Sequence, residues 1–422
     1  MHGEMWIAEC RVQNGKGIGW KIANRTGIAL LIGMFSVVWM LWTGPAQATT
    51  IEWANAGSTW AIGSNWVGGT APADSTVTDI ASFGSTGVSP INPNLTVQRS
   101  ITGLIFLSGA YSYTIGGSII TIGGSGLSNS ATNIETFSNG IRTSTSQTWT
   151  TNSGGTLVLN GTVDINQNLA TTRTLTVNGA GNTTFNGTIQ NSFVGSTGNL
   201  THIGSGTLTL AGNNTYTGTT TLSGGTTLIN GNQSSAIGAV SVNNTGTVLG
   251  GTGTIGGAVT INSGANITGA TNGTVGTLTL SSTLTLSGAS GNLAAYLVDI
   301  SGSTSDKLAI GSSLNLSGSF DKIAFTGPAD GATTYVLATY SSLSGTFDTV
   351  TGLPNGYQLI YGATELDLVP VPEAETWLSG ALAFAGIGFS QRRRFFRKLN
   401  EANGMRDIEG KATRAVASER GR

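Results

Sequence analysis

The sequence predicts an all-β fold, a parallel β-helix (solenoid) in which short strands stack coil upon coil. Three observations predict it. The 422 residues include 64 glycines, and glycine at this density disfavours long helices in the middle of the chain. Short segments alternate Leu or Val with Thr or Asn, which is the two-residue period of a half-buried strand. Glycine-rich turns separate these segments at intervals too short for intervening helices.

The strand segments are variants of one short sequence motif. Gly-Thr-Leu-Thr-Leu occurs at 206–210 and 276–280, and related motifs occupy 155–159, 283–288 and 313–318. Recurring strands with one apolar face bury that face when successive coils stack. Three faces and roughly 20 to 25 residues per coil predict on the order of a dozen coils. An array of β-sandwiches is the alternative architecture.

The N-terminal segment, 1–48, has the pattern of a secretory signal peptide. An apolar stretch at 27–42 is followed by the small-x-small sequence Ala46-Gln47-Ala48. The positive charges that precede the apolar stretch are those of Lys16, Lys21 and Arg25. The pattern predicts cleavage after Ala48 and a mature chain that starts at Thr49. An uncleaved N-terminal anchor is the alternative.

The composition of residues 49–369 excludes two classes of function. This region has five Lys or Arg and twelve Asp or Glu, a net charge of −7. Nucleic-acid binding requires clustered cations, so no nucleic-acid partner is expected. The only cysteine, Cys10, lies in the leader, and the mature chain therefore has no disulfide and no thiolate metal site.

No catalytic, cofactor-binding or metal-binding residue is predicted. His202 is the only histidine after the leader, and a transition-metal site would need further ligands. Two pairs of carboxylates are close in sequence, Asp74 with Asp79 and Asp299 with Asp306. Glycosidases use two carboxyl groups that flank a sugar, so a polysaccharide lyase or hydrolase on the same fold is the alternative. We expect these carboxylates to be solvated loop residues.

Four tryptophans are concentrated towards the N-terminus of the predicted mature chain. They are Trp53, Trp60, Trp66 and Trp149. Their rings either cover the open end of the first coil or stack on sugar rings. A solenoid needs a cap at each end, which favours the first interpretation.

An apolar run near the C-terminus predicts a single transmembrane helix. Residues 377–389 carry no charge and would span about 20 Å as a helix, less than a full bilayer core. Trp377 suits one membrane interface, and Arg392, Arg393 and Arg394 suit the cytoplasmic side. A buried amphipathic helix of a globular domain is the alternative.

Pro372 and Glu373 precede this apolar run, and the basic cluster of Arg392, Arg393 and Arg394 follows it. With these three features in order, the segment resembles the PEP-CTERM sorting signal of Gram-negative bacteria. Two features depart from the family: Ala374 replaces the second proline, and a long tail, 395–422, follows the arginines. The resemblance implies processing by an exosortase-type enzyme. It also implies a setting of exopolysaccharide and biofilm formation.

A second resemblance covers residues 204–232. This stretch is similar to the autotransporter-associated β-strand repeat of bacterial surface-exported passengers, and 213–218 (Asn-Asn-Thr-Tyr-Thr-Gly) is its most distinctive part. The resemblance implies a parallel β-helix and an exported surface protein, and it implies no catalytic activity.

The predicted organisation follows from these segments. It comprises a signal peptide (1–48), an N-terminal cap with the first coils (49–150), a β-strand repeat solenoid (151–320), a β-rich C-terminal cap (321–369), a sorting signal with a transmembrane segment (370–394) and a basic cytoplasmic tail (395–422).

The predicted function is that of an exported, non-enzymatic structural or adhesive protein. It would cross the inner membrane, be anchored transiently by its C-terminal helix, and then reach the cell surface, the outer membrane or the medium. The expected partners are the processing enzyme, the membrane and exopolysaccharide. Besides the enzyme, a protein-binding surface module is a further alternative.

Overall fold

The computed structural model describes residues 48–87 and 89–371. Thr49 is the first residue of the first strand, and Ala48 precedes it as an unpaired residue. Several predicted site residues lie outside the described residues: Ala46, Pro372, Glu373, Arg392, Arg393 and Arg394. Among the described residues, no helix is long and apolar enough to span a membrane, and the predicted span at 377–389 falls outside them.

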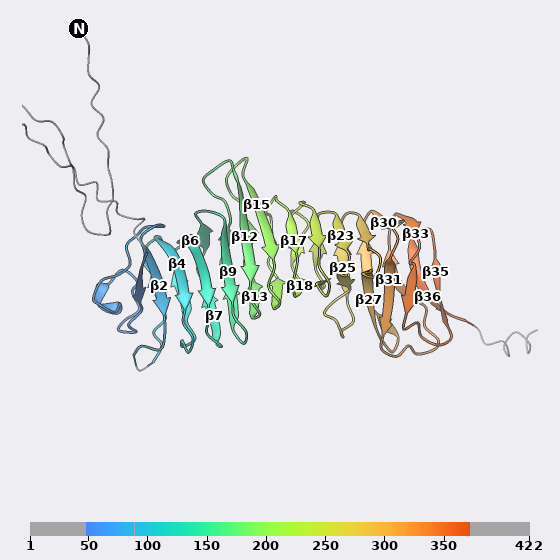
Figure 1. Cartoon of the computed structure of the whole chain (residues 1–422), viewed down its shortest axis with the longest axis horizontal. Helices are drawn as coiled ribbons and strands as arrows, with labels where there is room; N and C mark the ends of the chain where they lie inside the picture. The colour runs from blue at the N-terminus through green and yellow to red at the C-terminus, as the bar shows by residue number, and fades with distance from the viewer. Residues whose placement is uncertain (1–47, 88, 372–422) are drawn as a thin grey trace, which may run out of the picture. The chain divides into compact units, whose positions relative to one another are not determined.

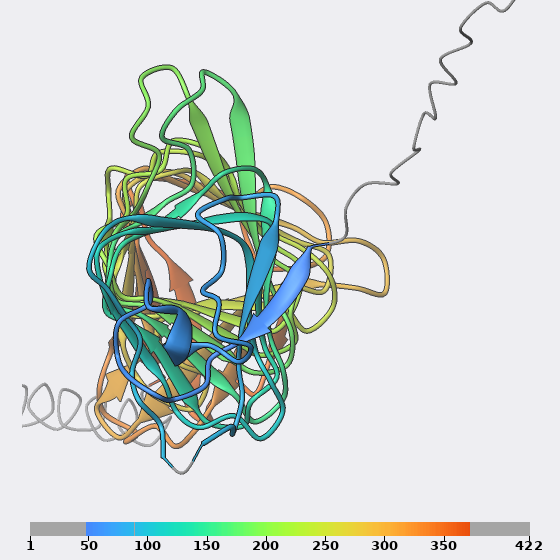
Figure 2. The ribbon, with the colours of Figure 1, turned by 90° about the vertical axis from the view of Figure 1, so that its left-hand side faces the viewer.

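The described chain is a parallel β-solenoid built from three sheets (Figure 1). Its secondary structure consists of strands and one short 3-10 helix, η1 (Gly63–Asn65). Viewed from the N-terminal side, successive coils superimpose around a common interior (Figure 2). Each strand pairs in parallel with the equivalent strand of the next coil, which confirms the predicted fold class and excludes the sandwich array.

The first sheet has 16 strands, most of them on one path that gains a strand with each coil. This path runs through β1 (Thr49–Glu52), β2 (Asp79–Phe83), β4 (Arg99–Phe106), β6 (Ile120–Asn129), β9 (Gln147–Thr151), β12 (Thr172–Asn178), β15 (Thr197–His202), β17 (Thr220–Leu222), β20 (Val240–Val242), β23 (Val259–Asn262), β26 (Leu284–Ser287), β30 (Ser313–Leu316) and β33 (Ser342–Gly345). Three short strands leave this path at β6, namely β8 (Ile141–Thr143), β11 (Val163–Asp164) and β14 (Ile189–Gln190).

The second sheet has 13 strands, and twelve of them lie on one path. They are β3 (Asn94–Leu95), β5 (Thr114–Gly117), β7 (Ile134–Phe137), β10 (Thr156–Leu159), β13 (Asn182–Phe185), β16 (Thr207–Leu210), β18 (Thr226–Ile229), β21 (Val248–Gly250), β24 (Asn266–Thr268), β27 (Ala294–Ser301), β31 (Asp321–Thr326) and β34 (Thr349–Thr351). One strand per coil agrees with the dozen coils that the sequence predicts. The remaining strand, β28 (Thr304–Ser305), pairs antiparallel with β27.

The third sheet has seven strands and closes the C-terminal half. They are β19 (Asn232–Gln233), β22 (Thr254–Ile255), β25 (Thr277–Leu280), β29 (Lys307–Ile310), β32 (Tyr335–Thr339), β36 (Glu365–Pro370) and β35 (Tyr357–Tyr361). β36 runs antiparallel to β32, and β35 is antiparallel to β36, so it runs in the direction of β32 again. This antiparallel hairpin ends the parallel stacking of the third sheet.

The alternating sequence motifs form strands whose aliphatic side chains point inward. In β16, Leu208 and Leu210 are fully buried, whereas Thr207 and Thr209 are half-buried on the outer side. The other motifs form β10 (from 155–159), β25 (from 276–280), β26 (from 283–288) and β30 (from 313–318). The two-residue period therefore locates both the strand and its buried face.

The coils differ in length more than the sequence predicts. In the second sheet, Leu249 pairs with Ile267 of the next coil, and Ile267 pairs in turn with Tyr296, after a clearly longer stretch of chain. The strands keep their register while the loops at the corners change in length. Because loop closure costs little extra free energy per added residue, such variation is tolerated.

Three of the four tryptophans form the N-terminal cap. Trp53, Trp60 and Trp66 are each at most 2% exposed, and the ring centroid of Trp66 lies 4.9 Å from that of Trp53 and 4.8 Å from that of Trp60. These rings pack on Phe83 of β2. Trp149 instead lies in the solenoid interior, stacked on Phe185. The capping interpretation is confirmed for the first three, and burial leaves none of the four free to stack on a sugar.

Candidate functional site

The carboxylates of Asp299 and Asp306 are buried. Asp306 is fully buried and Asp299 is 7% exposed, so the prediction that they are solvated loop residues was wrong. The two oxygens of Asp306 accept hydrogen bonds from Gly276 N at 2.8 Å, Thr268 Oγ1 at 2.8 Å and Asp299 N at 3.2 Å. Burial raises the pKa of Asp306 above its usual value, and the hydrogen bonds oppose that shift.

Asp299 completes this network. Its carboxylate accepts hydrogen bonds from Gly273 N at 2.6 Å and from Thr326 Oγ1 at 2.5 Å. Gly273 and Gly276 belong to the loop between β24 and β25, and Thr326 ends β31. The two carboxylates therefore fasten a corner loop to the second sheet, which is a structural role.

Replacing Asp306 by alanine is expected to lower the free energy of unfolding by about 2 kcal/mol, because it leaves the buried Thr268 hydroxyl and the buried Asp299 N–H without this acceptor. Denaturant titration of the full-length chain measures this change. Glu365→Ala, which removes an exposed carboxylate on β36, is the control and should change the value by less than about 0.5 kcal/mol. Equal losses in both variants would show that the network contributes nothing specific.

The carboxylates of the other predicted pair each accept a hydrogen bond from a separate backbone amide. Asp79 begins β2 and accepts a hydrogen bond from Ala73 N at 2.7 Å, while Asp74 accepts one from Ser100 N at 2.6 Å. Among residues 48–87 and 89–371, no group of three or more His, Cys, Asp or Glu side chains is arranged to hold a metal ion.

His202 is a core residue. It ends β15, is 2% exposed, and its Nδ1 lies 2.9 Å from Thr227 Oγ1 on β18. Burial lowers the pKa of His202 to about 4, so the imidazole is neutral at physiological pH. The prediction that this lone histidine is a core or surface residue rather than a ligand agrees with its burial.

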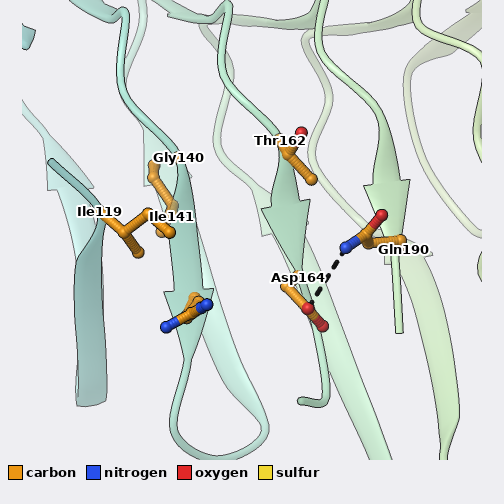
Figure 3. Close-up of a pocket in the computed structure, with 7 residues that line it drawn as sticks. Ile119, Gly140, Ile141, Thr162, Asp164 and Gln190 are labelled. Carbon is orange, nitrogen blue, oxygen red and sulfur yellow. Dashed lines mark hydrogen bonds between the residues drawn. The ribbon is translucent and has the colours of Figure 1, made fainter. Parts of the chain in front are cut away.

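A polar hollow lies on the outside of β8, β11 and β14 (Figure 3). We call it the Arg142 hollow; it has a volume of about 220 Å³ and is lined by Ile119, Gly140, Ile141, Arg142, Thr162, Asp164 and Gln190. Parallel pairing creates it, because Asp164 is in register with Arg142 in the preceding coil and with Gln190 in the following coil.

Asp164 is the most strongly held residue of the hollow. It is 5% exposed, and its Oδ1 accepts hydrogen bonds from Asn166 N and Ser192 N, both at 3.2 Å. Its Oδ2 accepts from the Ser192 hydroxyl and from Gln190 Nε2, the latter at 3.4 Å (Figure 3). With two donors on each oxygen, Asp164 acts as an anchor for the surrounding chain.

Two equivalent loops are anchored at Asp164. The loop at 165–171 is closed by a hydrogen bond from Asn166 Nδ2 to Thr171 O at 2.7 Å. The loop at 191–196 is closed in the same way, from Asn191 Nδ2 to Ser196 O at 3.0 Å. They connect to β12 and β15 and project at the top of Figure 1. The loops are uncharged, and their tips expose apolar side chains, with Val194 91% exposed.

The cations of the solenoid are concentrated around this region. Arg99, Arg142 and Arg173 are the only arginines between residues 49 and 369, and both lysines lie beyond residue 300. Arg173 is buried and donates a hydrogen bond to Thr143 O at 2.8 Å. Burial lowers the pKa of Arg173, and the Asp164 carboxylate opposes the shift. Arg142 is half-buried on the outer face.

A second, more open hollow lies further along the chain. Its volume is about 560 Å³, and it is lined by Asn243, Asn244, Thr245, Asn262, Ser263 and Asn292. Asn262 donates to Asn243 at 2.8 Å, and Asn292 donates to Thr245 at 3.0 Å. This surface presents amides and hydroxyls without any charged group.

Sequence reasoning missed both hollows. Arg142, Asp164 and Gln190 come from three successive coils, and no local motif connects them. The signal that would find them is the register of the coils, which local patterns leave undetermined.

Comparison with known families agrees with one of the two resemblances. Residues 200–229 match the sequence model of the family described as Passenger-associated-transport-repeat. The matched residues run from the middle of β15 to the end of β18 and form a short part of the 422-residue chain. No curated protein matches the chain. The chain is thus a parallel β-solenoid that contains a passenger-type repeat, and the PEP-CTERM resemblance remains a prediction.

Proposed function

We propose that the protein is an exported, non-enzymatic component of the cell surface or extracellular matrix, with a structural or adhesive role. One observation carries the proposal: the solenoid fills the interval between the two predicted targeting segments. Its first strand begins at Thr49, directly after the predicted cleavage site, and its last strand ends at Pro370, the first residue of the predicted sorting-signal segment. A passenger-type repeat lies within this folded unit.

The expected mechanism is mechanical. Continuous ladders of parallel strands make the chain a stiff spacer, and rows of Thr, Asn and Ser side chains cover its outer faces. Many weak contacts from such rows to a polymer add up through multivalency. Exopolysaccharide is the proposed partner, and an exosortase-type enzyme that acts at Pro372 and Glu373 is the proposed processing partner.

Labelling of intact cells tests the surface location. An epitope inserted at Gly246, which lies in an exposed turn where an added Cβ meets no atom within 4 Å, is expected to be accessible to antibody without permeabilisation. A loop insertion of this kind should be tolerated. An epitope accessible only after permeabilisation would contradict the proposal.

Mass spectrometry of the exported protein tests both targeting predictions. We expect an N-terminal peptide that starts at Thr49 and no peptides beyond Arg394. Intact peptides from 395–422 in the exported protein would argue against processing at the sorting signal. Turnover of any glycan by the purified protein would overturn the non-enzymatic part of the proposal.

A further inference from the structure

We propose that the Arg142 hollow binds the carboxylate-bearing sugar residues of an acidic polysaccharide. The inference rests on the proposed function, since it names the class of polymer that the exported solenoid would contact. The volume of about 220 Å³ is smaller than the roughly 300–1,000 Å³ of sites for drug-sized ligands, and it suits one sugar ring of a chain that continues along the surface.

The guanidinium of Arg142 supplies the charge. Its Nη1 donates a hydrogen bond to Gln98 Oε1 at 3.1 Å, so a neutral amide rather than a carboxylate holds it. A guanidinium has five N–H donors in a planar fork, and this fork matches the two oxygens of a carboxylate. The fixed position of Arg142 on β8 reduces the entropy lost when an anion binds.

The charge distribution along the solenoid favours an anion at this place. Residues 80–298 contain three arginines and two acids, Glu135 and Asp164, whereas residues 49–79 contain three acids and no cation, and residues 299–369 contain seven acids and two lysines. Glu135 is fully buried, and Asp164 already accepts two hydrogen bonds on each oxygen. An acidic polymer is therefore repelled by the C-terminal coils and attracted to the coils around Arg142.

The other lining groups favour a sugar over an acidic peptide. Thr162 and Gln190 offer a hydroxyl and an amide to sugar hydroxyls, and the half-buried Ile119 offers an apolar surface to the ring. An extended peptide binds most readily by adding a strand to a free sheet edge. At the hollow no edge is free: β11 pairs with β8 and β14, and on the outer edge of β14 Ile189 N donates to Asn214 Oδ1 at 2.7 Å while Ile189 O accepts from Thr215 N at 2.9 Å.

Titration of the full-length chain, purified in mild detergent, with oligogalacturonate tests the inference. We expect binding that weakens as salt is raised, and at least about tenfold weaker binding by Arg142→Gln, because a charge-assisted pair is lost. Arg142→Lys keeps the charge without the fork and should lie between the two. The methyl ester of the same oligosaccharide removes the ligand's charge and should bind as weakly to the wild type as the acid binds to Arg142→Gln.

Lys322→Gln is the matched control, because it removes an equal charge from β31 of the second sheet and should leave the affinity unchanged. Equal affinity for acid and ester, an equal loss in the control, or tighter binding of polyglutamate would overturn the inference. So would the absence of binding. The labelling of intact cells tests the surface location independently of this titration. If the protein is labelled at the surface but does not bind the acidic oligosaccharide, the proposed function stands and only the proposed ligand class is refuted.

Discussion

Replacing Glu135 by glutamine is expected to stabilise the solenoid by about 3 kcal/mol more at pH 8 than at pH 5. Glu135 lies on β7, faces the interior and is fully buried. Its Oε2 accepts a hydrogen bond from Tyr113 N at 2.8 Å, and its Oε1 has no partner among the described residues. Burial raises the pKa of Glu135 from 4.5 to about 8, and the Tyr113 hydrogen bond opposes the shift.

The direction of the pH dependence follows from proton binding. Between pH 4.5 and about 8 the folded protein retains a proton on Glu135 that the unfolded chain has lost. The free energy of unfolding therefore falls as pH rises through this window, with a maximum slope of about 1.4 kcal/mol per pH unit. Glutamine mimics the protonated side chain at every pH, so the variant lacks this contribution.

Urea titrations of the full-length chain at pH 5 and pH 8 measure the effect. Asp321, whose pKa burial raises to about 6, gives a slope of the same sign, so the difference between variant and wild type isolates Glu135. Glu365→Gln, which neutralises an exposed carboxylate, is the control and should leave the pH dependence unchanged. A glutamine variant whose advantage is the same at both pH values would show that Glu135 is ionised in the folded protein.

His202 is expected to set the acid limit of stability. Its pKa is lowered from 6.5 to about 4 by burial, so the unfolded chain gains a proton before the folded protein does. Stability is lost as pH falls from 6.5 towards 4, so this slope has the opposite sign to that of Glu135. The two pH windows overlap between 4.5 and 6.5, where the slopes nearly cancel, and the two buried groups together favour maximum stability in this mildly acidic range.

The strands and their buried faces were predictable because both depend on neighbouring residues. Alternation of Leu with Thr specifies an inward and an outward side within a single short strand, as in β16 and β25. The cap was predictable for a similar reason, because an open solenoid end must be covered and Trp53, Trp60 and Trp66 are large enough to cover it.

The register of the coils was not predictable from the repeated motifs. The similar motifs at 155–159 and 206–210 lie in the second sheet, the motif at 276–280 lies in the third, and that at 313–318 lies in the first. The sheet to which a motif contributes its strand depends on the lengths of the loops before it, and these lengths vary. Without the register, Arg142, Asp164 and Gln190 cannot be brought together.

Buried acids were missed for a different reason. In β7 the exposed residue is Ile134, at 56%, and the buried one is Glu135. Local hydrophobicity indicates the opposite orientation. Phe137, which follows on the same side of the strand and is fully buried, sets the inward face. Asp306 was misjudged likewise, because its hydrogen-bond donors Gly276 and Thr268 lie far earlier in the chain.

Replacing Gly212 by alanine is expected to lower the free energy of unfolding by about 3 kcal/mol. Gly212 belongs to a ladder of glycines that occupies one corner of successive coils. A Cβ at Gly212 would lie 2.2 Å from the carbonyl oxygen of Gly187, and one at Gly231 would lie 2.2 Å from that of Gly212. These contacts are far shorter than any real Cβ contact, and both partners are backbone atoms.

The backbone at this corner cannot move aside cheaply. Gly212 N donates to Phe185 O at 3.1 Å and Gly231 N donates to Leu210 O at 2.9 Å, so a shift of one coil disturbs the hydrogen bonds on both sides. In a solenoid each coil contacts only its neighbours. The damage is therefore expected to weaken the interface between coils and to broaden or split the denaturant transition.

Gly116→Ala is the matched control. Gly116 lies in β5, its φ is not in the left-handed region, and a Cβ there would meet no atom within 4 Å. Because alanine restricts the unfolded chain, this substitution should be neutral or stabilise by up to about 1 kcal/mol. A similar loss of unfolding free energy in both variants would mean that the chain requires glycine for its backbone conformational freedom and not for the close approach of stacked coils. A loss confined to Gly212 would establish that the glycine at this corner is required by the spacing between stacked coils.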